Sequence, residues 1–302
     1  MTMPHLKANG IDLAYDSFGD DAAEAILLIS GLGTQRIRWT LSFCEALARR
    51  GYRVIRFDNR DAGGSTHFSD HPAPDFGALA AELGAGRRPA VPYTLHEMAA
   101  DAIGLLDALA ISRAHVVGRS MGGMIAQIVA SEYPDRVLSL TSIMSGTGNP
   151  ALPSAAPDVM AMMMRPTPDP FADEAGYLAA RLAFAKRIAG HPFDEALHRE
   201  FLLGELRCAY DPAGSARQIA AIAVTGDRRA RLATIQVPAL VIHGTDDPLI
   251  PPACGEDTAA AIPGAELLLL DGMGHDLPAE LDATVIDAIV RTAERGSKPA
   301  TA

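Results

Sequence analysis

Hydrophobic residues along the chain fall into short continuous runs that alternate with longer runs of helical spacing. The short runs, rich in Val, Ile and Leu, predict strands at residues 11–15, 25–29, 52–57, 115–118 and 137–144. The longer runs predict helices at residues 39–50, 94–109 and 121–133, with Thr94 as a helix N-cap. This alternation predicts an α/β fold with a mostly parallel central sheet and helices on both faces.

The alternation stops between residues 146 and 235. Prolines gather at the start of this segment, a methionine-rich run follows at residues 159–165, and the later stretches have helical spacing without strands. Strands then return at residues 239–243 and 265–270, with helices at residues 255–261 and 281–294. We therefore expect an α/β core of residues 1–145 and 236–302, interrupted by a helical insertion of residues 146–235.

Composition narrows the class of protein. The 302 residues are 48% hydrophobic and 21% charged, as in globular proteins, and the net charge of −11 disfavours nucleic acid or an anionic membrane as partner. Cys44, Cys208 and Cys254 are too far apart for a zinc motif or a disulfide framework, which suits a reducing compartment. With no 18-residue apolar run and no signal-peptide pattern, we expect a soluble cytoplasmic protein, a monomer or a homodimer.

Residues 118–122 read G-R-S-M-G, between a predicted strand and a predicted helix. A turn this tight brings the backbone so close that side chains at Gly118 and Gly122 would collide with it. Ser120 would then have strained dihedral angles and a hydroxyl that projects above the edge of the sheet. The pattern predicts a nucleophile elbow, the alternative being a turn serine of no chemical interest.

A serine hydroxyl needs a general base and a group that orients the base. His275 lies in G-M-G-H-D, directly after a predicted strand, where catalytic groups gather in parallel α/β sheets. The acid is expected on a strand-end loop between serine and histidine, where Asp246 and Asp247 are both candidates. His243 is expected to be structural, and His67 to be a solvated loop residue.

The oxyanion that forms when serine attacks a carbonyl needs two backbone N–H donors. Met121, directly after the serine, is expected to supply one. The loop I-L-L-I-S-G-L-G is expected to supply the other from Leu32, since Gly31 lets the backbone approach a bound carbonyl.

Taken together, these motifs resemble the α/β-hydrolase superfamily over nearly the whole chain. They are most similar to the branch that contains aclacinomycin methylesterase and related bacterial carboxylesterases. The resemblance implies an α/β-hydrolase fold in which the insertion is a helical cap, or lid, over the site. The family spacing G-x-x-D-x-x-x-P, counted from Gly244 to Pro251, selects Asp247 as the acid.

The resemblance implies a serine esterase that acts on a small-molecule carboxylic ester through an acyl-enzyme, with no metal or organic cofactor. A lactonase, a C–C bond hydrolase or a cofactor-free perhydrolase would use nearly the same three residues, so these activities stay open. A non-catalytic ligand-binding protein on this fold is a more distant alternative, since it usually carries a damaged triad.

Two residues depart from the family pattern. Ser30 stands where many relatives have histidine before the glycine of the oxyanion loop, so this loop is expected to be anchored differently. Arg119 occupies an elbow position that is usually small or apolar; we expect it to pair with a carboxylate or to lie in solvent, with attraction of an acidic substrate as the alternative. Met160 and Met163 either pack the insertion or line an apolar substrate pocket together with Gly31 and Arg119.

Overall fold

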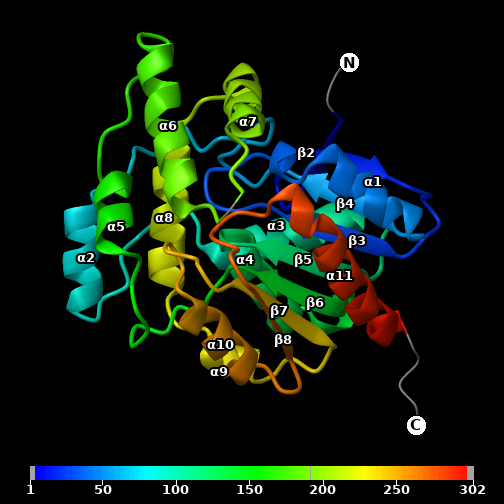
Figure 1. Cartoon of the computed structure of the whole chain (residues 1–302). Coiled ribbons are helices and arrows are strands. Elements are labelled where there is room, and N and C mark those ends of the chain that lie inside the picture. Colours follow the sequence, from blue (N-terminus) through cyan, green and yellow to red (C-terminus); the bar gives the residue numbers. More distant parts are fainter. Residues whose placement is uncertain (1–3, 191, 298–302) are drawn as a thin grey trace.

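An eight-stranded sheet in the order β1-β2-β4-β3-β5-β6-β7-β8 forms the centre of the fold (Figure 1). The computed structural model describes residues 4–190 and 192–297. The strands are β1 (His5–Ala8), β2 (Ile11–Phe18), β3 (Ala25–Ile29), β4 (Arg53–Phe57), β5 (Ala114–Arg119), β6 (Val137–Ile143), β7 (Ala239–Gly244) and β8 (Glu266–Leu270). β1 pairs with β2, and β2 with β4, in antiparallel register, whereas all pairs from β4 to β8 are parallel. The prediction of a mostly parallel sheet is confirmed.

Helices cover both faces of this sheet. α1 (Leu41–Arg49) and α11 (Asp282–Ser297) pack on one face, where their apolar residues join those of the strands in one core cluster. α3 (Leu95–Ala108), α4 (Met121–Glu132) and α10 (Pro252–Ala261) pack on the other face around a second cluster. Every residue of β3, β6 and β7 is buried, as expected of strands with helices on both sides.

Two elements near the N-terminal end were not predicted, although each has a local sequence signal. β1 and β2 form a hairpin through Asn9 and Gly10, which have φ of 49° and 80°, the left-handed values that an Asn-Gly pair favours in a two-residue hairpin turn. α2 (Phe76–Gly84) begins after Asp75, whose side chain accepts hydrogen bonds from the next turn as an N-cap does. The predicted cap at Thr94 is confirmed: its side chain accepts from the N–H of His96.

Between β6 and β7 the chain forms helices without strands. They are α5 (Pro157–Met163), α6 (Glu174–Ile188), α7 (Glu195–Cys208), α8 (Pro212–Thr225) and the short α9 (Arg229–Leu232). α6 and α7 have a small apolar cluster of their own, formed by Tyr177, Leu178, Leu182 and Leu202. Figure 1 shows α5, α6, α7 and α8 gathered at one side of the sheet.

The chain leaves the core after β6 and returns to it before β7 at nearly the same place. A Cβ on Gly148 would lie 2.2 Å from the carbonyl oxygen of Gly226, so the outgoing and returning backbones touch. Arg228 joins them: its backbone N–H donates to the Thr147 carbonyl, and its buried guanidinium donates to the carbonyls of Gly146 and Gly226. We call this pair of segments, residues 146–149 and 226–228, the crossing.

Short 3₁₀ turns, η1 (Arg36–Arg38), η2 (Pro134–Arg136) and η3 (Ala279–Leu281), complete the described elements. In the described ranges, no helix combines the length and apolar character needed to cross a membrane.

Candidate active site

Ser120 lies at a sharp turn between β5 and α4. Its φ of 54° and ψ of −124° are sparsely populated for a residue with a side chain, so neighbouring contacts must hold the turn. Two hydrogen bonds do so: the Ser120 N–H donates to the Ile143 carbonyl at 2.9 Å, and the Ser120 carbonyl accepts from the Ser145 hydroxyl at 2.8 Å. The strained elbow predicted from the sequence is therefore present in the structure.

The glycines on either side of Ser120 are required by close backbone contacts. A Cβ on Gly118 would lie 2.0 Å from the carbonyl oxygen of Gly122, and one on Gly122 would lie 2.2 Å from that of Ile29. Backbone at these distances cannot move aside without shifting β3 or α4. The elbow is therefore compatible only with glycine at both positions.

Gly122→Ala is expected to lower the free energy of unfolding by about 3 kcal/mol, because its methyl group would overlap backbone atoms in a packed core. Urea unfolding followed by circular dichroism measures this change. Gly84→Ala is the matched control, since a Cβ there meets no atom within 4 Å. Equal stability of both variants would show that the elbow tolerates a side chain.

Ser120, His275 and Asp247 form one chain of hydrogen bonds. The Ser120 Oγ lies 2.9 Å from His275 Nε2, and His275 Nδ1 lies 2.7 Å from Asp247 Oδ2. The three residues follow β5, β8 and β7, so each comes from a loop at the carboxyl end of a parallel strand. This geometry lets His275 accept the hydroxyl proton while Nδ1–H remains bonded to a carboxylate.

Asp247 is buried and held on both carboxylate oxygens. Its Oδ1 accepts from the N–H groups of Leu249 and Ile250, at 2.9 and 2.8 Å, while Oδ2 accepts from His275. Burial alone would raise its pKa, but the charge of His275 and these hydrogen bonds outweigh it, and the pKa of Asp247 is lowered to about 2. Asp246 is exposed, and among the described residues its side chain hydrogen-bonds only with its neighbour Thr245. Of the two candidates, only Asp247 contacts His275.

His243 lies at the end of β7, fully buried, and its Nε2 bonds to the Ile250 carbonyl at 2.8 Å. The same nitrogen is 3.5 Å from Asp247 Oδ2, the oxygen that also accepts from His275. Its contacts are those of a residue that supports the acid loop.

The backbone N–H groups of Leu32 and Met121 make no hydrogen bond with any acceptor in the described part of the chain. The Leu32 loop lies against the serine: a Cβ on Gly31 would be 3.7 Å from Ser120 Oγ. Asn59 anchors this loop by donating to the Ser30 carbonyl at 3.0 Å, and Gln218 of α8 accepts from the Gly33 N–H at 2.8 Å. Asn59 and Gln218 are therefore the residues that anchor the loop containing Ser30.

Residues of the inserted helices hold the histidine loop, a role that the sequence did not reveal. The His275 N–H donates to the carbonyl of Ile188 at the end of α6, at 2.6 Å. Asp276, the next residue, lies 3.1 Å from His198 Nε2 on α7. Both contacts join positions more than 70 residues apart, which periodicity and spacing cannot pair.

A cavity of about 450 Å³ lies over Ser120 and His275. Its apolar lining comes mainly from the inserted helices and includes Met144, Met162, Met163, Phe184, Ile188, Leu202 and Ile219. Gly31, Leu32, Arg119 and Met163 also line it. Met160 does not, which corrects its placement in the pocket: it lies about one helical turn before the end of α5 that reaches the cavity, and is 42% exposed.

Arg119 forms no ion pair with a described carboxylate, contrary to one of the two expectations, and its side chain is half-buried at the edge of the cavity. No carboxylate of the described residues lies within 4.0 Å of its guanidinium, which sits 5.3 Å from the ring centroid of Trp39. Burial lowers the pKa of Arg119 to about 10, with the nearby charge of Asp276 acting in the opposite direction. The side chain is therefore still a cation at neutral pH.

His67 is bonded rather than solvated: its two ring nitrogens contact Asp211 and the Gly63 carbonyl. Asp61, His67 and Asp211 could in principle hold a metal ion. However, Arg217 already occupies their centre, with bonds of 2.8 Å to both Asp61 oxygens and to Asp211. A cation would have to displace this guanidinium, so we assign the cluster to structure, not to metal binding.

Sequence comparison identifies relatives over most of the chain. Rhodomycin D methylesterase DauP of Streptomyces sp. (strain C5) is 31% identical over 300 residues, covering 92% of this chain and 94% of that protein. Rhodomycin D methylesterase DnrP of Streptomyces peucetius is 30% identical over 307 residues, with the same coverage. The resemblance predicted from the motifs is confirmed.

Comparison with solved structures agrees with the comparison of sequences. The enol-lactonase from Burkholderia xenovorans LB400 superposes with a TM-score of 0.70 at 25% identity, over 96% of this chain and all of that one. A family model described as the alpha/beta hydrolase fold matches residues 24–280. The eight-stranded sheet, the elbow and these matches agree, and the chain belongs to the alpha/beta hydrolase family.

Proposed function

We propose that the chain is a serine hydrolase of carboxylic esters in which Ser120 is the nucleophile, His275 the general base and Asp247 the group that orients it. The observation that carries the proposal is the hydrogen-bonded chain from Ser120 through His275 to Asp247, at the floor of a cavity large enough for a small molecule. The similarity to two rhodomycin D methylesterases supports an ester as substrate.

In the first half of the proposed reaction, Ser120 Oγ attacks the ester carbonyl carbon while its proton moves to His275 Nε2. The carbonyl oxygen becomes an anion, and the unpaired N–H groups of Leu32 and Met121 are the donors we propose for it. Asp247 stabilises the resulting imidazolium without taking its proton. The tetrahedral intermediate then collapses, and the alcohol leaves with the proton from His275, so that an acyl group remains on Ser120.

The second half repeats these steps with water. His275 takes a proton from a water molecule as its oxygen attacks the acyl carbon, and a second oxyanion forms. Collapse releases the carboxylic acid and returns the proton to Ser120 Oγ. The low pKa of Asp247 supports this assignment, because the carboxylate stays ionised throughout the neutral range.

In the same proposal, the inserted helices of residues 146–235 act as a cap. Most of the apolar cavity lining comes from them, and they hold both the Leu32 loop, through Gln218, and the histidine loop, through Ile188. Substrate shape would then be selected by the cap, and the chemistry would be performed by the core.

A lactone is the second candidate substrate, because the enol-lactonase of Burkholderia xenovorans shares 25% identity over nearly the full length. A lactone is a cyclic ester, and the steps above apply to it without change. The difference lies in the products, since ring opening gives one hydroxy acid where an open ester gives an acid and an alcohol.

A fluorophosphonate probe with p-nitrophenyl esters of increasing acyl length tests the function. We expect one covalent adduct, located on Ser120 by peptide mass spectrometry. The fraction of hydrolytic activity that is lost should equal the fraction of chain that is labelled. Heat-denatured chain serves as the control, because labelling should need the folded site. A γ-lactone assayed by proton release in parallel separates the two substrate classes. An unlabelled Ser120 in active protein would contradict the proposal.

A further inference from the structure

Arg119 borders both the large cavity over Ser120 and a second cavity of about 150 Å³. It is the last residue of β5 and directly precedes Ser120. The carbon of its guanidinium lies 5.3 Å from the centroid of the Trp39 ring, a cation–π contact that helps to fix its position. The N–H edges of the guanidinium are left available for another partner.

Nothing in the described residues accepts a hydrogen bond from these edges. A guanidinium has five N–H donors, and buried donors are normally paired. The two nearest carboxylates are engaged elsewhere: Asp276 contacts His198 at 3.1 Å, and both oxygens of Glu205 accept from Arg38 at 2.8 Å. Arg119 is thus a half-buried cation at the edge of the cavity, and its side-chain donors bond to none of the described residues.

The rest of the lining adds to the positive charge. The charged residues that line the larger cavity, apart from histidines, are Arg38, Arg119, Arg165, Arg181 and Asp276. Of the four arginines, only Arg38 forms an ion pair with a described residue. The Nε of Arg181 is buried and has no hydrogen-bond partner among the described residues.

We propose that the cavity binds esters that carry a second, ionised carboxylate, and that Arg119 binds this carboxylate. The inference rests on the proposed ester hydrolysis and names its substrate class. A carboxylate accepts two parallel bonds from a guanidinium, which suits the open edge of Arg119. Because Arg119 and Ser120 line the same cavity, one small molecule can present the carboxylate to Arg119 and the ester to Ser120.

The remainder of that molecule is apolar. Met144, Phe184, Ile188, Leu202 and Ile219 contribute side chains to the lining, and such surfaces favour hydrocarbon. The substrate class is therefore a half-ester with a hydrocarbon body, in which one carboxyl group is esterified and the other is free.

Two pairs of esters test the proposal, each matched in size. In the first pair the carboxylate is on the acyl side: p-nitrophenyl hydrogen adipate is compared with p-nitrophenyl methyl adipate. In the second it is on the alcohol side: p-acetoxybenzoate is compared with its methyl ester. The readout is the ratio of kcat/KM for the anionic ester to that for its neutral counterpart.

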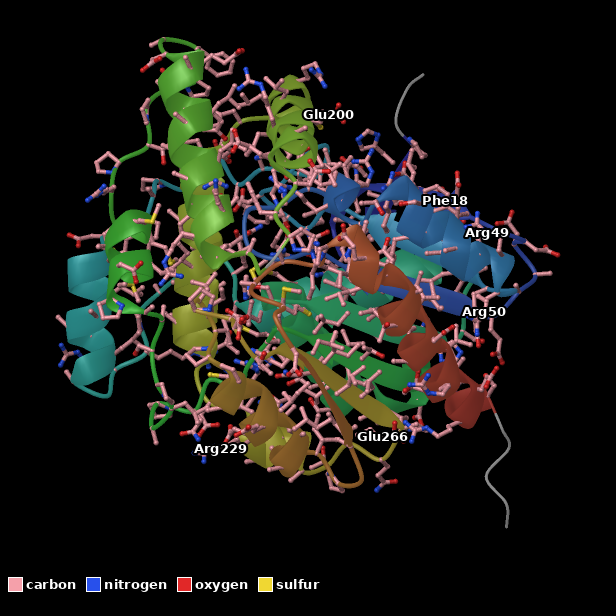
Figure 2. All side chains as sticks on the ribbon, in the orientation of Figure 1. Phe18, Arg49, Arg50, Glu200, Arg229 and Glu266 are labelled. Carbon is pink, nitrogen blue, oxygen red and sulfur yellow. The ribbon has the colours of Figure 1, made fainter. Side chains whose placement is uncertain are left out.

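Arg119→Gln is expected to lower this ratio by about 10- to 100-fold for at least one pair, the range for a lost hydrogen bond to a charged group. Arg119→Lys keeps the charge and should restore part of the ratio. Arg49→Gln removes a cation that points outward from α1, as Figure 2 shows, and should leave the ratio within twofold of wild type. The pair that responds identifies the side of the ester on which the carboxylate lies.

A binding measurement separates failure of this inference from failure of the proposed function. Calorimetry with the Ser120→Ala variant should give a lower Kd for methyl hydrogen adipate than for dimethyl adipate. In the double variant Ser120→Ala, Arg119→Gln, the two Kd values should be equal. If, for both pairs, the ratio of kcat/KM between the anionic and the neutral ester is the same in wild type and in Arg119→Gln, the inference about the carboxylate is wrong. The proposed ester hydrolysis is not affected by that result. If no ester is hydrolysed through Ser120, the function is wrong, and calorimetry alone decides the carboxylate site.

Discussion

Ser120→Ala is expected to lower kcat for p-nitrophenyl ester hydrolysis by about 10⁶-fold, the loss typical when a serine nucleophile is removed. The reason is that no acyl-enzyme can form, so any remaining hydrolysis depends on the Leu32 and Met121 N–H groups and on binding alone. KM, where measurable, should change little, because the cavity lining is otherwise intact. Long-time assays with background subtraction, after active-site titration of the wild type, measure the loss.

Ser131→Ala is the matched control for this change. Ser131 lies on the same helix, α4, near its other end, and among the described residues its hydroxyl bonds only to the carbonyl of Ile128. We expect kcat within twofold of wild type, because the substitution leaves the elbow untouched. Should Ser120→Ala keep a tenth or more of the activity, another nucleophile performs the reaction and the proposed mechanism fails.

Asp247→Asn is expected to lower kcat by about 10⁴-fold. The asparagine oxygen can still accept from Leu249 and Ile250, so the acid loop keeps its shape. Its NH₂ group would then face His275 Nδ1 and force that nitrogen to be the acceptor. The ring proton would move to Nε2, where it blocks transfer from Ser120, and the imidazolium would lose its counter-charge.

Asp246→Asn is the control that the sequence itself provides, one residue away. Its side chain is exposed and hydrogen-bonds only with Thr245 in the described part of the chain, so kcat should stay within about threefold of wild type. Steady-state kinetics of both variants, with thermal unfolding to show that each is folded, compares the two carboxylates directly. A large loss in Asp246→Asn together with an active Asp247→Asn would reverse the assignment of the acid.

Local sequence signals were enough to predict the strands from β2 onward and the elbow, whereas the choice between two adjacent aspartates also needed the resemblance to a family. The elbow can be predicted because its cause is local: Gly118 and Gly122 stand where a Cβ would strike backbone. The distinction between Asp246 and Asp247 came from family spacing, and the structure agrees in that only Asp247 is buried against His275.

What could not be predicted depends on contacts between distant segments. The environment of Arg119 is set by the ring of Trp39 and by the charges of Asp276, Arg38 and Glu205, none of which is near it in sequence. Met160 and Met163 read alike in the sequence, yet only Met163 reaches the cavity, because the placement of α5 decides it. The four residues of β1 were too few to show a periodicity.

The crossing held by Arg228 has a consequence for how such proteins diversify. The segment between β6 and β7 begins and ends where Gly148 and Gly226 meet. Its two ends are therefore as close together as the ends of a short loop that connects these strands directly. Replacing these helices by others of different length would leave the strand order in place, but the His275 loop would lose its contacts with Ile188 and His198. A new set of helices between residues 149 and 225 would therefore fit the same sheet only if it again held the His275 loop.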